Sequence, residues 1–358
     1  MRLNKDLSIK ISIIIVGYNS WADLKRCLPS VFLWTDPDVE VIVVDNGSSD
    51  ETLAELPNKF PSVKLIIAKE NSGFGAGCNL GAEAALGEYL VFLNPDTLVS
   101  QDALRELISP LEIDPDVGMT TPKILQMDHP TRINTCGNDV HLSGLALCRG
   151  MNEEASKYTL TEEVNSISGA AFAIKKDYFF ELGAFDPAFF LYVEDTDLSL
   201  RCLLNGKRIV YVPNSVIYHD YKLTFGPKKV YYQERNRNYM LQKLFSKKTL
   251  HSLAPVLCVA DFMTWGFCIL HGKREIQNKL DAKKWLRENS ELISSRHAST
   301  ESIRKVADYQ VIKQFGWKVD FRQTVAPLPA ILLSCFFYPI YYICTKVVLW
   351  SMNFKLKD

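Results

Sequence analysis

A carboxylate stands at the end of an apolar segment in the first third of the chain. The segment "YLVFLNPDTLV", residues 89–99, is typical of a buried strand that stops at Asn94-Pro95-Asp96. Two interpretations are open for this stop. A polar residue, a proline and a carboxylate can simply form a turn. Alternatively, Asp96 can bind a metal ion that carries a phosphate group. Asp96 alone does not decide between them.

Three carboxylates lie close together in "FFLYVEDTDLSLR", residues 189–201. Asp197 and Arg201 are four residues apart and can form an ion pair on one helix face, which is the interpretation we favour for Asp197. Glu194 and Asp195 then remain at the helix N-terminus. An acid there can serve as a general base for an attacking hydroxyl if it comes within hydrogen-bond reach.

A histidine, His219, follows two short apolar segments at residues 209–212 and 216–218, which we interpret as strands. A lone histidine is usually a packing or surface residue. Here its imidazole can alternatively supply a nitrogen ligand to a metal ion that Asp96 also binds.

Two loops directly follow apolar segments in the first hundred residues. In "VVDNGSSDET", a capped turn accounts for Asp50 but not for Asp45 at the strand end, where a carboxylate can bind a base N–H or a ribose hydroxyl. In "ENSGFGAGCNLGAEAALG", the glycines permit close approach of the backbone to a ligand, although a tight turn before a helix explains them equally well. The glycine spacing does not match a dinucleotide fingerprint.

The elements that position these residues alternate between strand and helix. Apolar runs at residues 11–16, 39–44, 63–68 and 89–93 alternate with helical patterns at 21–32, 49–56 and 76–86. This order predicts an α/β fold with a mainly parallel sheet and helices on both faces. Ligands of such sheets bind beyond the carboxyl ends of the strands, where Asp45 and Asp96 are expected.

Composition excludes several protein classes. The 358 residues carry 41 basic and 41 acidic side chains, so a dedicated nucleic-acid binder is not expected. The nine cysteines are odd in number and form no CxxC pair, which favours reduced thiols in a cytosolic compartment. The apolar run after Lys10 is only about six residues long, so we interpret it as a strand and not as a signal peptide.

The chain changes character after residue 240, which predicts two domains, 1–240 and 241–358. Segments 253–270 and 323–350 are strongly apolar, although Asp261 interrupts the first and Pro339 the second. Both can be buried helices, or helices that span the membrane or lie in its interface. We favour the membrane for the second segment because of its length and its many aromatic residues. Between them, "SIRKVADYQVI" predicts an amphipathic helix.

Four motifs together carry a family resemblance. "ISIIIVGYNS", "VIVVDNGSSDET", "NSGFGAGCNLGAEAALGEYLVFLNPDT" and "FFLYVEDTDLSLR" occur in this order, and residues 9–240 resemble a family 2 inverting glycosyltransferase of the GT-A fold. The chain is most similar to the rhamnosyltransferase-like branch of bacteria. The resemblance implies catalysis by Asp195 with Glu194, and a divalent ion, Mg²⁺ or Mn²⁺, bound by Asp96 and His219. It also implies a donor site composed of Tyr18, Asn19, Asp45, Asp50, Asn71, Gly73, Phe74, Asn79, Asn94 and Arg235.

One departure and one ambiguity accompany this assignment. Asn94 stands where the general family has the first carboxylate of its metal motif. The family's Arg-Asn element matches either Arg235-Asn236 or Arg237-Asn238. With these residues, the resemblance implies transfer of a sugar, with rhamnose favoured, from a dTDP- or UDP-sugar to a hydroxyl of a glycan or lipid-linked acceptor. The expected product is a cell-surface polysaccharide, and the expected location is the cytoplasmic face of the cell membrane.

Two other functions stay open at this point. The chain can be a catalytically inactive scaffold subunit of a polysaccharide assembly complex, although Asp45, Asp96 and Asp195 argue against it. A nucleotide-dependent oxidoreductase would use the same α/β layers, but the first turn, "VGYNSWADL", lacks the glycines that a nicotinamide-binding sheet needs.

Overall fold

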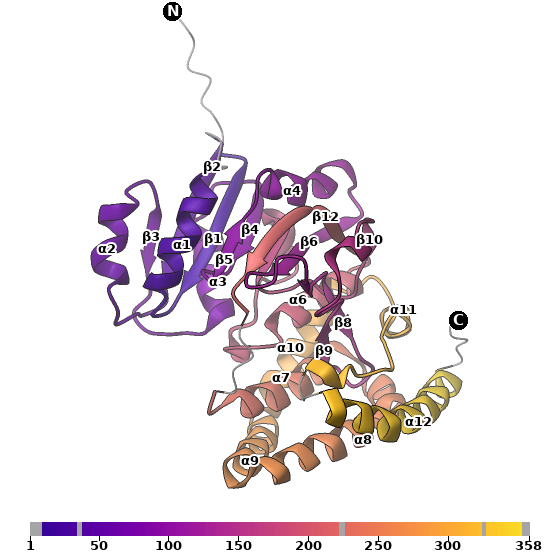
Figure 1. Cartoon of the computed structure of the whole chain (residues 1–358). Coiled ribbons are helices and arrows are strands. Elements are labelled where there is room, and N and C mark those ends of the chain that lie inside the picture. Colours follow the sequence, from indigo (N-terminus) through magenta and orange to yellow (C-terminus); the bar gives the residue numbers. More distant parts are fainter. Residues whose placement is uncertain (1–8, 34–37, 222–225, 324–326, 353–358) are drawn as a thin grey trace, which may run out of the picture.

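The computed structural model describes residues 9–33, 38–221, 226–323 and 327–352. The first eight residues, on which part of the expectation about a signal peptide falls, lie outside this range. A twisted sheet with flanking helices forms one end of the molecule, and long helices from the last third of the chain form the other (Figure 1). The domain boundary expected at residue 240 falls inside helix α7 (Lys229–Leu244) and stays a prediction.

The first four strands form the parallel half of the sheet, in the order β4 (Tyr89–Leu93), β1 (Ile11–Gly17), β2 (Val39–Asp45) and β3 (Lys64–Ile67). The register pairs Gly17 with Asp45 and Ile15 with Leu93, so the carboxyl ends of β1, β2 and β4 lie side by side. The predicted α/β fold and its strands are therefore confirmed.

Helices cover both faces because alternate residues of these strands point in opposite directions. On one face, Ile13 and Ile15 pack with residues of α1 (Trp21–Phe32) and α4 (Ala103–Ile113). On the other face, Ile14 and Val16 pack with residues of α3 (Phe74–Ala84) and α6 (Glu194–Leu204). Helix α2 (Thr52–Lys59) connects β2 to β3.

The second half of the sheet is mixed, which the sequence pattern did not reveal. Strand β11 (Ala171–Lys175) runs antiparallel between β4 and β6 (Val117–Gln126). Strand β12 (Arg208–His219) then pairs in parallel with β6 and includes both short strands expected at 209–218, with an irregularity between Val212 and Val216. Its last residues pair with β5 (Thr97–Val99), which sets His219 opposite Thr97.

Smaller elements complete the part of the chain that precedes α7. Strand β7 (Ile133–Thr135) pairs with β6, β10 (Glu162–Glu163) pairs with β12, and β8 (Asn138–Val140) forms a hairpin with β9 (Ala146–Cys148). Helix α5 (Lys176–Glu181) follows β11.

The last third of the chain is helical, with α7 followed by α8 (Lys247–His271), α9 (Lys273–Glu288), α10 (Ser290–Ile303), α11 (Asp308–Ile312) and α12 (Pro327–Ser351). Helices α8 and α12 are each long and apolar enough to cross a membrane by length and composition. Only 22% of the apolar window of each is buried. Residues 324–326 of the apolar segment predicted at 323–350 lie outside the described residues.

The single amphipathic helix predicted for "SIRKVADYQVI" is wrong. Helix α10 ends at Ile303 and α11 begins at Asp308. Between them, the backbone N–H groups of Lys305 and Val306 both donate to the carbonyl of Leu204 at the end of α6. This tertiary contact replaces the hydrogen bonds that a continuous helix would make.

Candidate active site

Asp96 and His219 meet at the end of the central strands. The turn between β4 and β5 carries Asp96, whose carbonyl accepts the N–H of Asp220, and the β5–β12 pairing brings up His219. Nε2 of His219 lies 3.3 Å from Oδ1 of Asp96. Nδ1 of His219 is 2.9 Å from Oδ1 of Asn134, on β7. Because that amide oxygen is an acceptor, it fixes a proton on Nδ1 and leaves the lone pair of Nε2 facing the carboxylate.

This arrangement fits a divalent cation. Oδ1 of Asp96 is buried and has no hydrogen-bond partner among the described residues. An imidazole lone pair and an unpartnered carboxylate oxygen that face one another are both suitable metal ligands, and the second nitrogen of the imidazole is held by a supporting residue as in known metal sites. Within the described ranges no cluster of three or more His, Cys, Asp or Glu side chains could hold a metal ion. The remaining ligands would therefore come from a bound molecule.

The second strand end carries a buried carboxylate. Asp45 is fully buried, its Oδ2 accepts the N–H of Ser48, and its Oδ1 has no partner in the described structure. Tyr18 lies one strand away at the end of β1 and is 51% exposed. A buried acceptor beside an exposed aromatic ring can bind the edge and face of a nucleotide base.

Asn19 and Asp50 build the loops around Asp45. Oδ1 of Asn19 accepts the N–H groups of Ser49 and Asp50, at 2.8 and 3.2 Å. The carboxylate of Asp50 accepts the N–H of Trp21 at 2.9 Å. These bonds tie the loop after β1 to the loop after β2. The expectation that both side chains bind the donor directly stays a prediction, and their described contacts support a role in shaping the loops.

The glycine-rich loop is anchored by amides. Asn71 accepts the N–H of Gly73 and bonds to Asn46, whose Nδ2 also donates to the carbonyl of Gly73. Gly73 has a φ of 91°, and a Cβ there would lie 2.2 Å from the carbonyl oxygen of Phe190, so no other residue fits without rearrangement.

Further along the same loop, two of the predicted donor-binding residues contact protein. The N–H of Phe74 donates to the carbonyl of Phe190. Asn79 makes two hydrogen bonds to the backbone of Phe185, at 2.8 and 3.0 Å. The loop is thereby fixed to the segment that precedes α6. Donor binding by Phe74 and Asn79 stays a prediction.

Glu194 and Asp195 occupy the first turn of α6, as expected. Asp195 accepts the N–H groups of Gly169, at 3.0 Å, and of Thr196, at 2.7 Å. Burial raises the pKa of Asp195, although these hydrogen bonds oppose the shift. Burial and the adjacent charge of Asp195 also raise the pKa of Glu194, whose Oε2 has no partner among described atoms. A carboxylate with a raised pKa is suited to accept a proton.

The expected ion pair of Asp197 and Arg201 is present, with 2.7 Å between its atoms and full burial. Lys243 of α7 joins it, since its Nζ lies 2.9 Å from both Asp197 and Asp186. The predicted ion pair is therefore present, and it belongs to a buried ionic cluster that the sequence did not predict.

The segment before α6 has a strained backbone, and hydrogen bonds from side chains of α7 hold it in place. Phe190, Tyr192 and Val193 all have positive φ, which costs free energy for residues of these types. Nδ2 of Asn236 lies 2.7–2.9 Å from the carbonyls of Phe189, Leu191 and Tyr192. Asn236 thus keeps the backbone just before Glu194 in a conformation that it would not adopt alone.

Arg235 supports the same segment. Its guanidinium donates to the carbonyls of Ala188 and Phe189. Arg237, by contrast, binds the carbonyl of Ser143 and the carboxylate of Glu234. The Arg-Asn pair that holds the strained segment is therefore Arg235-Asn236. Direct contact of Arg235 with donor phosphate stays a prediction that these bonds do not require.

The contact of Asn134 with His219 and the backbone hydrogen bonds of Asn94 were not predicted from the sequence. Nothing in "RINTCGND" distinguishes Asn134, because its partner His219 belongs to a distant strand. Asn94 was expected beside the donor. The structure places it at the strand end, where its N–H donates to Ala170 and its carbonyl accepts the Thr97 hydroxyl. Donor contact by the side chain of Asn94 stays a prediction.

Comparison with known proteins decides the family. The model of "Glycosyl transferase family 2" matches residues 12–181. The chain is 30% identical over 236 residues to N-acetylglucosaminyl-diphospho-decaprenol L-rhamnosyltransferase of Mycobacterium tuberculosis, covering 58% of this chain and 75% of that protein. The chain belongs to glycosyl transferase family 2. It is a glycosyltransferase, as the four sequence motifs predicted.

The chain is also similar to other glycan-synthesising proteins. Poly-beta-1,6-N-acetyl-D-glucosamine synthase of Staphylococcus aureus is 28% identical over 253 residues, which are 68% of this chain and 58% of the synthase. Among solved structures, GalNAc-T7 with UDP, GalNAc and Mn²⁺ superposes with a TM-score of 0.55 at 22% identity, covering 69% of this chain and 49% of that one.

The TarS 1-349 fragment of S. aureus in complex with UDP-GlcNAc superposes with a TM-score of 0.54 at 17% identity, covering 86% of this chain and 89% of that one. At these identities both structures establish the fold alone. That fold is GT-A, as expected for this family 2 glycosyltransferase.

Proposed function

We propose that this family 2 glycosyltransferase moves a sugar, rhamnose being the first candidate, from a nucleoside-diphosphate donor to a hydroxyl of a lipid-linked glycan, with inversion at the anomeric carbon. The meeting of Asp96 with His219 at the carboxyl ends of the strands carries this proposal. The mycobacterial relative is an L-rhamnosyltransferase for a decaprenol-linked sugar, which supports the choice of sugar and acceptor.

The donor nucleotide would bind across the ends of β1 and β2. The unpartnered Oδ1 of Asp45 would accept a hydrogen bond from the base, and the exposed ring of Tyr18 would stack on it. Asn71 and Gly73 hold the glycine-rich loop where its backbone can line the ribose and diphosphate. This arrangement suits a thymine or uracil base, whose ring N–H is a donor.

Asp96 and His219 would hold a divalent ion, Mg²⁺ or Mn²⁺. When bound, such an ion neutralises charge that develops on the departing diphosphate. Asn134 fixes the ring of His219 by the 2.9 Å bond to Nδ1. The solved structure of GalNAc-T7, a protein of the same fold, contains Mn²⁺, which is consistent with this assignment.

Asp195 would accept the proton of the acceptor hydroxyl as its oxygen attacks the anomeric carbon. The N–H groups of Gly169 and Thr196 orient the carboxylate, and burial gives it a raised pKa. Glu194 beside it, with its own raised pKa, limits the negative charge in the pair. The new bond forms on the face opposite the leaving diphosphate, so one displacement inverts the configuration.

Helices α8 and α12 would attach the enzyme to the cytoplasmic face of the membrane by lying in the interface. Asp261, in the middle of α8, pairs with Lys279 and Lys283 of α9, each at 3.0 Å. Nine of the 16 residues of α9 are charged, and Lys279 is also bound to Glu234 of α7. If α8 crossed the bilayer, it would carry α9 into hydrocarbon, at a large cost in free energy.

The exposed apolar residues of α12 also fit an interfacial helix. They fall on one broad stripe along its whole length: Leu328, Ile331, Leu332, Phe336, Tyr342, Ile343, Val347 and Trp350. The opposite face packs on the protein and includes Phe337 and Tyr341, whose hydroxyl is 4.0 Å from Sδ of Met263 in α8. A helix that rests on a bilayer by one face shows this division.

A screen of nucleotide sugars tests the proposed function. dTDP-rhamnose and UDP-sugars would be added to the full chain with and without Mn²⁺ or Mg²⁺, and thermal unfolding would be followed. A true donor binds only the folded state and should therefore raise Tm. This increase should require the metal ion, because the ion would help to hold the diphosphate of the donor. NMR of the product would then give the anomeric configuration. Stabilisation by none of these sugars, or a product of retained configuration, would contradict the proposal.

A further inference from the structure

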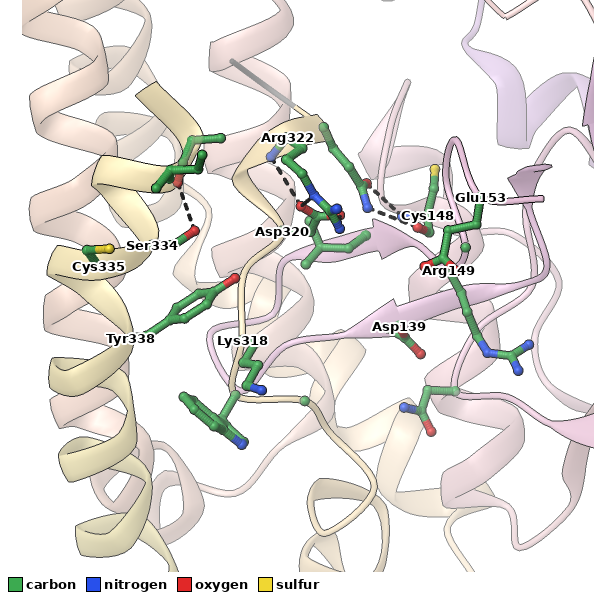
Figure 2. Close-up of a pocket in the computed structure, with 18 of the residues that line it drawn as sticks. Asp139, Cys148, Arg149, Glu153, Lys318, Asp320, Arg322, Ser334, Cys335 and Tyr338 are labelled. Carbon is green, nitrogen blue, oxygen red and sulfur yellow. Dashed lines mark hydrogen bonds and ion pairs between the residues drawn. The ribbon is translucent and has the colours of Figure 1, made fainter. Parts of the chain in front are cut away.

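A cavity of about 1090 Å³ lies between the catalytic half of the chain and α12. On one side are Asp139, Arg149 and Glu153 at the hairpin β8–β9, and on the other Ser334, Cys335 and Tyr338 project from α12 (Figure 2). The segment that leads from α11 into α12 forms a third side. No part of the donor or metal site described above lines this cavity.

The two main walls differ in chemistry. Three cationic side chains, Arg149, Lys318 and Arg322, line the polar side and the connecting segment together with three carboxylates, Asp139, Glu153 and Asp320. Arg149 and Arg322 have carboxylate partners, Glu162 and Asp320. In the described structure Lys318 pairs with no carboxylate and lies over the ring of Trp317, 5.0 Å from its centroid.

The wall from α12 is mostly apolar, since the hydroxyls of Ser334 and Tyr338 that also line it are bonded to backbone carbonyls. It includes Ala330 and Ile331, and it continues onto the exposed stripe at Leu328 and Leu332 outside the cavity. A ligand that fills both parts must be amphiphilic, because the polar wall needs a charged or hydroxylated group and the stripe needs hydrocarbon. A soluble saccharide would leave the apolar wall in water.

One wall of the cavity is linked through hydrogen bonds to the proposed catalytic base. Cys148 of β9 lines it, and burial followed by the nearby charge of Asp195 raises the pKa of that thiol to about 11. Asn138 of β8 bonds to the backbone of Ser166 and Ile167, and the chain then reaches Gly169, whose N–H donates to Asp195. The hairpin therefore connects the cavity wall directly to the residue that would take the acceptor's proton.

We propose that this cavity is the acceptor site and that it binds the head of an isoprenoid-diphosphate-linked saccharide. The diphosphate lies at Lys318, the hydrocarbon follows the stripe of α12 into the membrane, and the saccharide extends past Cys148 toward Asp195. This proposal deepens the function proposed above and rests on it for the identity of the reaction. Its binding step can be measured without donor or turnover.

Two native cysteines provide the first test. Cys335 lines the cavity and Cys258 on α8 does not, and both are exposed. Alkylation of each would be followed by mass spectrometry on the full chain in lipid nanodiscs, with farnesyl diphosphate as the probe. At twice its Kd the probe should slow alkylation of Cys335 about threefold, and Cys258 should be unaffected.

Farnesol and inorganic diphosphate are the matched controls, since each carries half of the probe. Neither should protect Cys335 at the same concentration. Equal protection by inorganic diphosphate would make the cavity a plain anion site, and equal protection by farnesol would make it a lipid groove. Either result, or a lack of protection by farnesyl diphosphate, overturns the proposal.

A charge reversal provides the second test. Lys318→Glu should raise the KM for a polyprenyl-diphosphate-linked N-acetylglucosamine about tenfold or more, the loss expected for a charge-assisted contact. Metal-dependent donor binding should not change. Lys313→Glu, an exposed lysine that does not itself line the cavity, is the control and should leave both quantities unaltered.

The outcomes separate the two proposals. If no nucleotide sugar binds, the proposed function fails, while cysteine protection still decides the cavity. If donors bind and the lipid-linked acceptor is extended, but Lys318→Glu and Lys313→Glu behave alike, the cavity is not the acceptor site.

Discussion

Nε2 of His219 faces Oδ1 of Asp96 at 3.3 Å, although the two residues are 123 positions apart in the chain. Both atoms are acceptors when the imidazole is neutral, because Nδ1 carries the proton that is donated to Asn134. Such a pair is stable when a cation or a proton lies between its members. This contact favours a metal-binding role for Asp96, at the end of "LNPD", over the role of an ordinary turn residue.

Removal of this carboxylate should abolish metal-dependent donor binding. Asp96→Ala leaves only one protein ligand for the ion, so the Tm increase given by nucleotide sugar with Mn²⁺ should fall to the value seen without metal. Asp128→Ala, an exposed carboxylate in the loop after β6, is the matched control and should behave as wild type. If Mn²⁺ still contributes the same increase in Tm in Asp96→Ala, residues 94–96 form only a turn and Asp96 does not bind the metal.

Asn134 should act through His219 and not by direct contact with the metal. Asn134→Leu removes the acceptor for Nδ1–H and should weaken Mn²⁺ affinity about 10- to 100-fold, as for other residues that support metal ligands. Asn134→Asp keeps an acceptor there and should restore most of the affinity. Titration with Mn²⁺ followed by electron paramagnetic resonance measures this without turnover. Equal affinity in the Leu variant and wild type would contradict the assignment.

Asp195 should be required for transfer but not for donor binding. Asp195→Asn removes the base and keeps the size of the side chain, so kcat should fall by about 10²–10⁴-fold with little change in donor Kd. Wild-type-like turnover by this variant would exclude Asp195 from the role.

The pH profile gives an independent check of the base. The base works only when deprotonated, and burial raises its pKa in the folded enzyme. As pH falls through that raised value, activity should be lost, so the acid limb of kcat/KM should lie above the ordinary aspartate pKa of about 4. An acid limb at or below that value would contradict the buried base.

Asn236 should maintain the strained segment before α6. Asn236→Leu leaves the carbonyls of Leu191 and Tyr192 without the donor that Asn236 supplies and removes one of the two donors of Phe189, which should cost about 1–3 kcal/mol of unfolding free energy. Released from α7, the segment should also misplace Glu194 and Asp195, so kcat should fall more than donor affinity.

Asn238 is the matched control because its amide donates only to the carbonyl of Glu234 on its own helix. Asn238→Leu should change both stability and kcat little. If the two variants lose activity equally, the bonds from Asn236 do not set the conformation of the active segment.

Features that depend on local sequence pattern could be predicted, and features that depend on contacts between distant segments could not. Strands β1, β2 and β4 are mainly apolar runs whose burial is visible in composition alone, and the ends of these strands and of the short, more exposed β3 were predicted to within a few residues. The alternation of strand and helix then placed Asp45 and Asp96 at one edge of the sheet, and the family resemblance gave Asp195 its role. Antiparallel β11 was not predicted, because the five residues of "AFAIK" show no pattern that distinguishes direction.

The features that were not predicted from sequence depend on contacts between segments that are distant in the chain. The break between α10 and α11 depends on the carbonyl of Leu204, about a hundred residues earlier in the chain. The importance of Asn134 and of Asn236 likewise depends on partners that only the fold brings near. Local pattern therefore predicted the strand ends and the acids on them, and tertiary contacts supplied the residues that orient those acids.

The apolar stripe of α12 should bind the enzyme to membranes with the helix parallel to the surface. Leu332→Glu together with Phe336→Glu removes two large side chains from the stripe and should weaken binding to anionic vesicles about tenfold or more. Ile113→Glu changes an apolar side chain of α4 that is 78% exposed and lies outside the stripe, and it should have no effect. Co-sedimentation with vesicles measures the difference, and circular dichroism confirms that each variant folds.

The depth of spin labels distinguishes an interfacial helix from a spanning one. Labels at Leu332→Cys, Ile343→Cys and Trp350→Cys all lie on the stripe but at different points along α12. If the helix lies in the interface, all three should report the same shallow depth by collision with oxygen and a nickel chelate. If it spans the bilayer, Ile343→Cys should be deepest. The second result would contradict the orientation imposed by Asp261, Lys279 and Lys283, because α12 packs along α8 and these ion pairs fix α8 beside the charged α9.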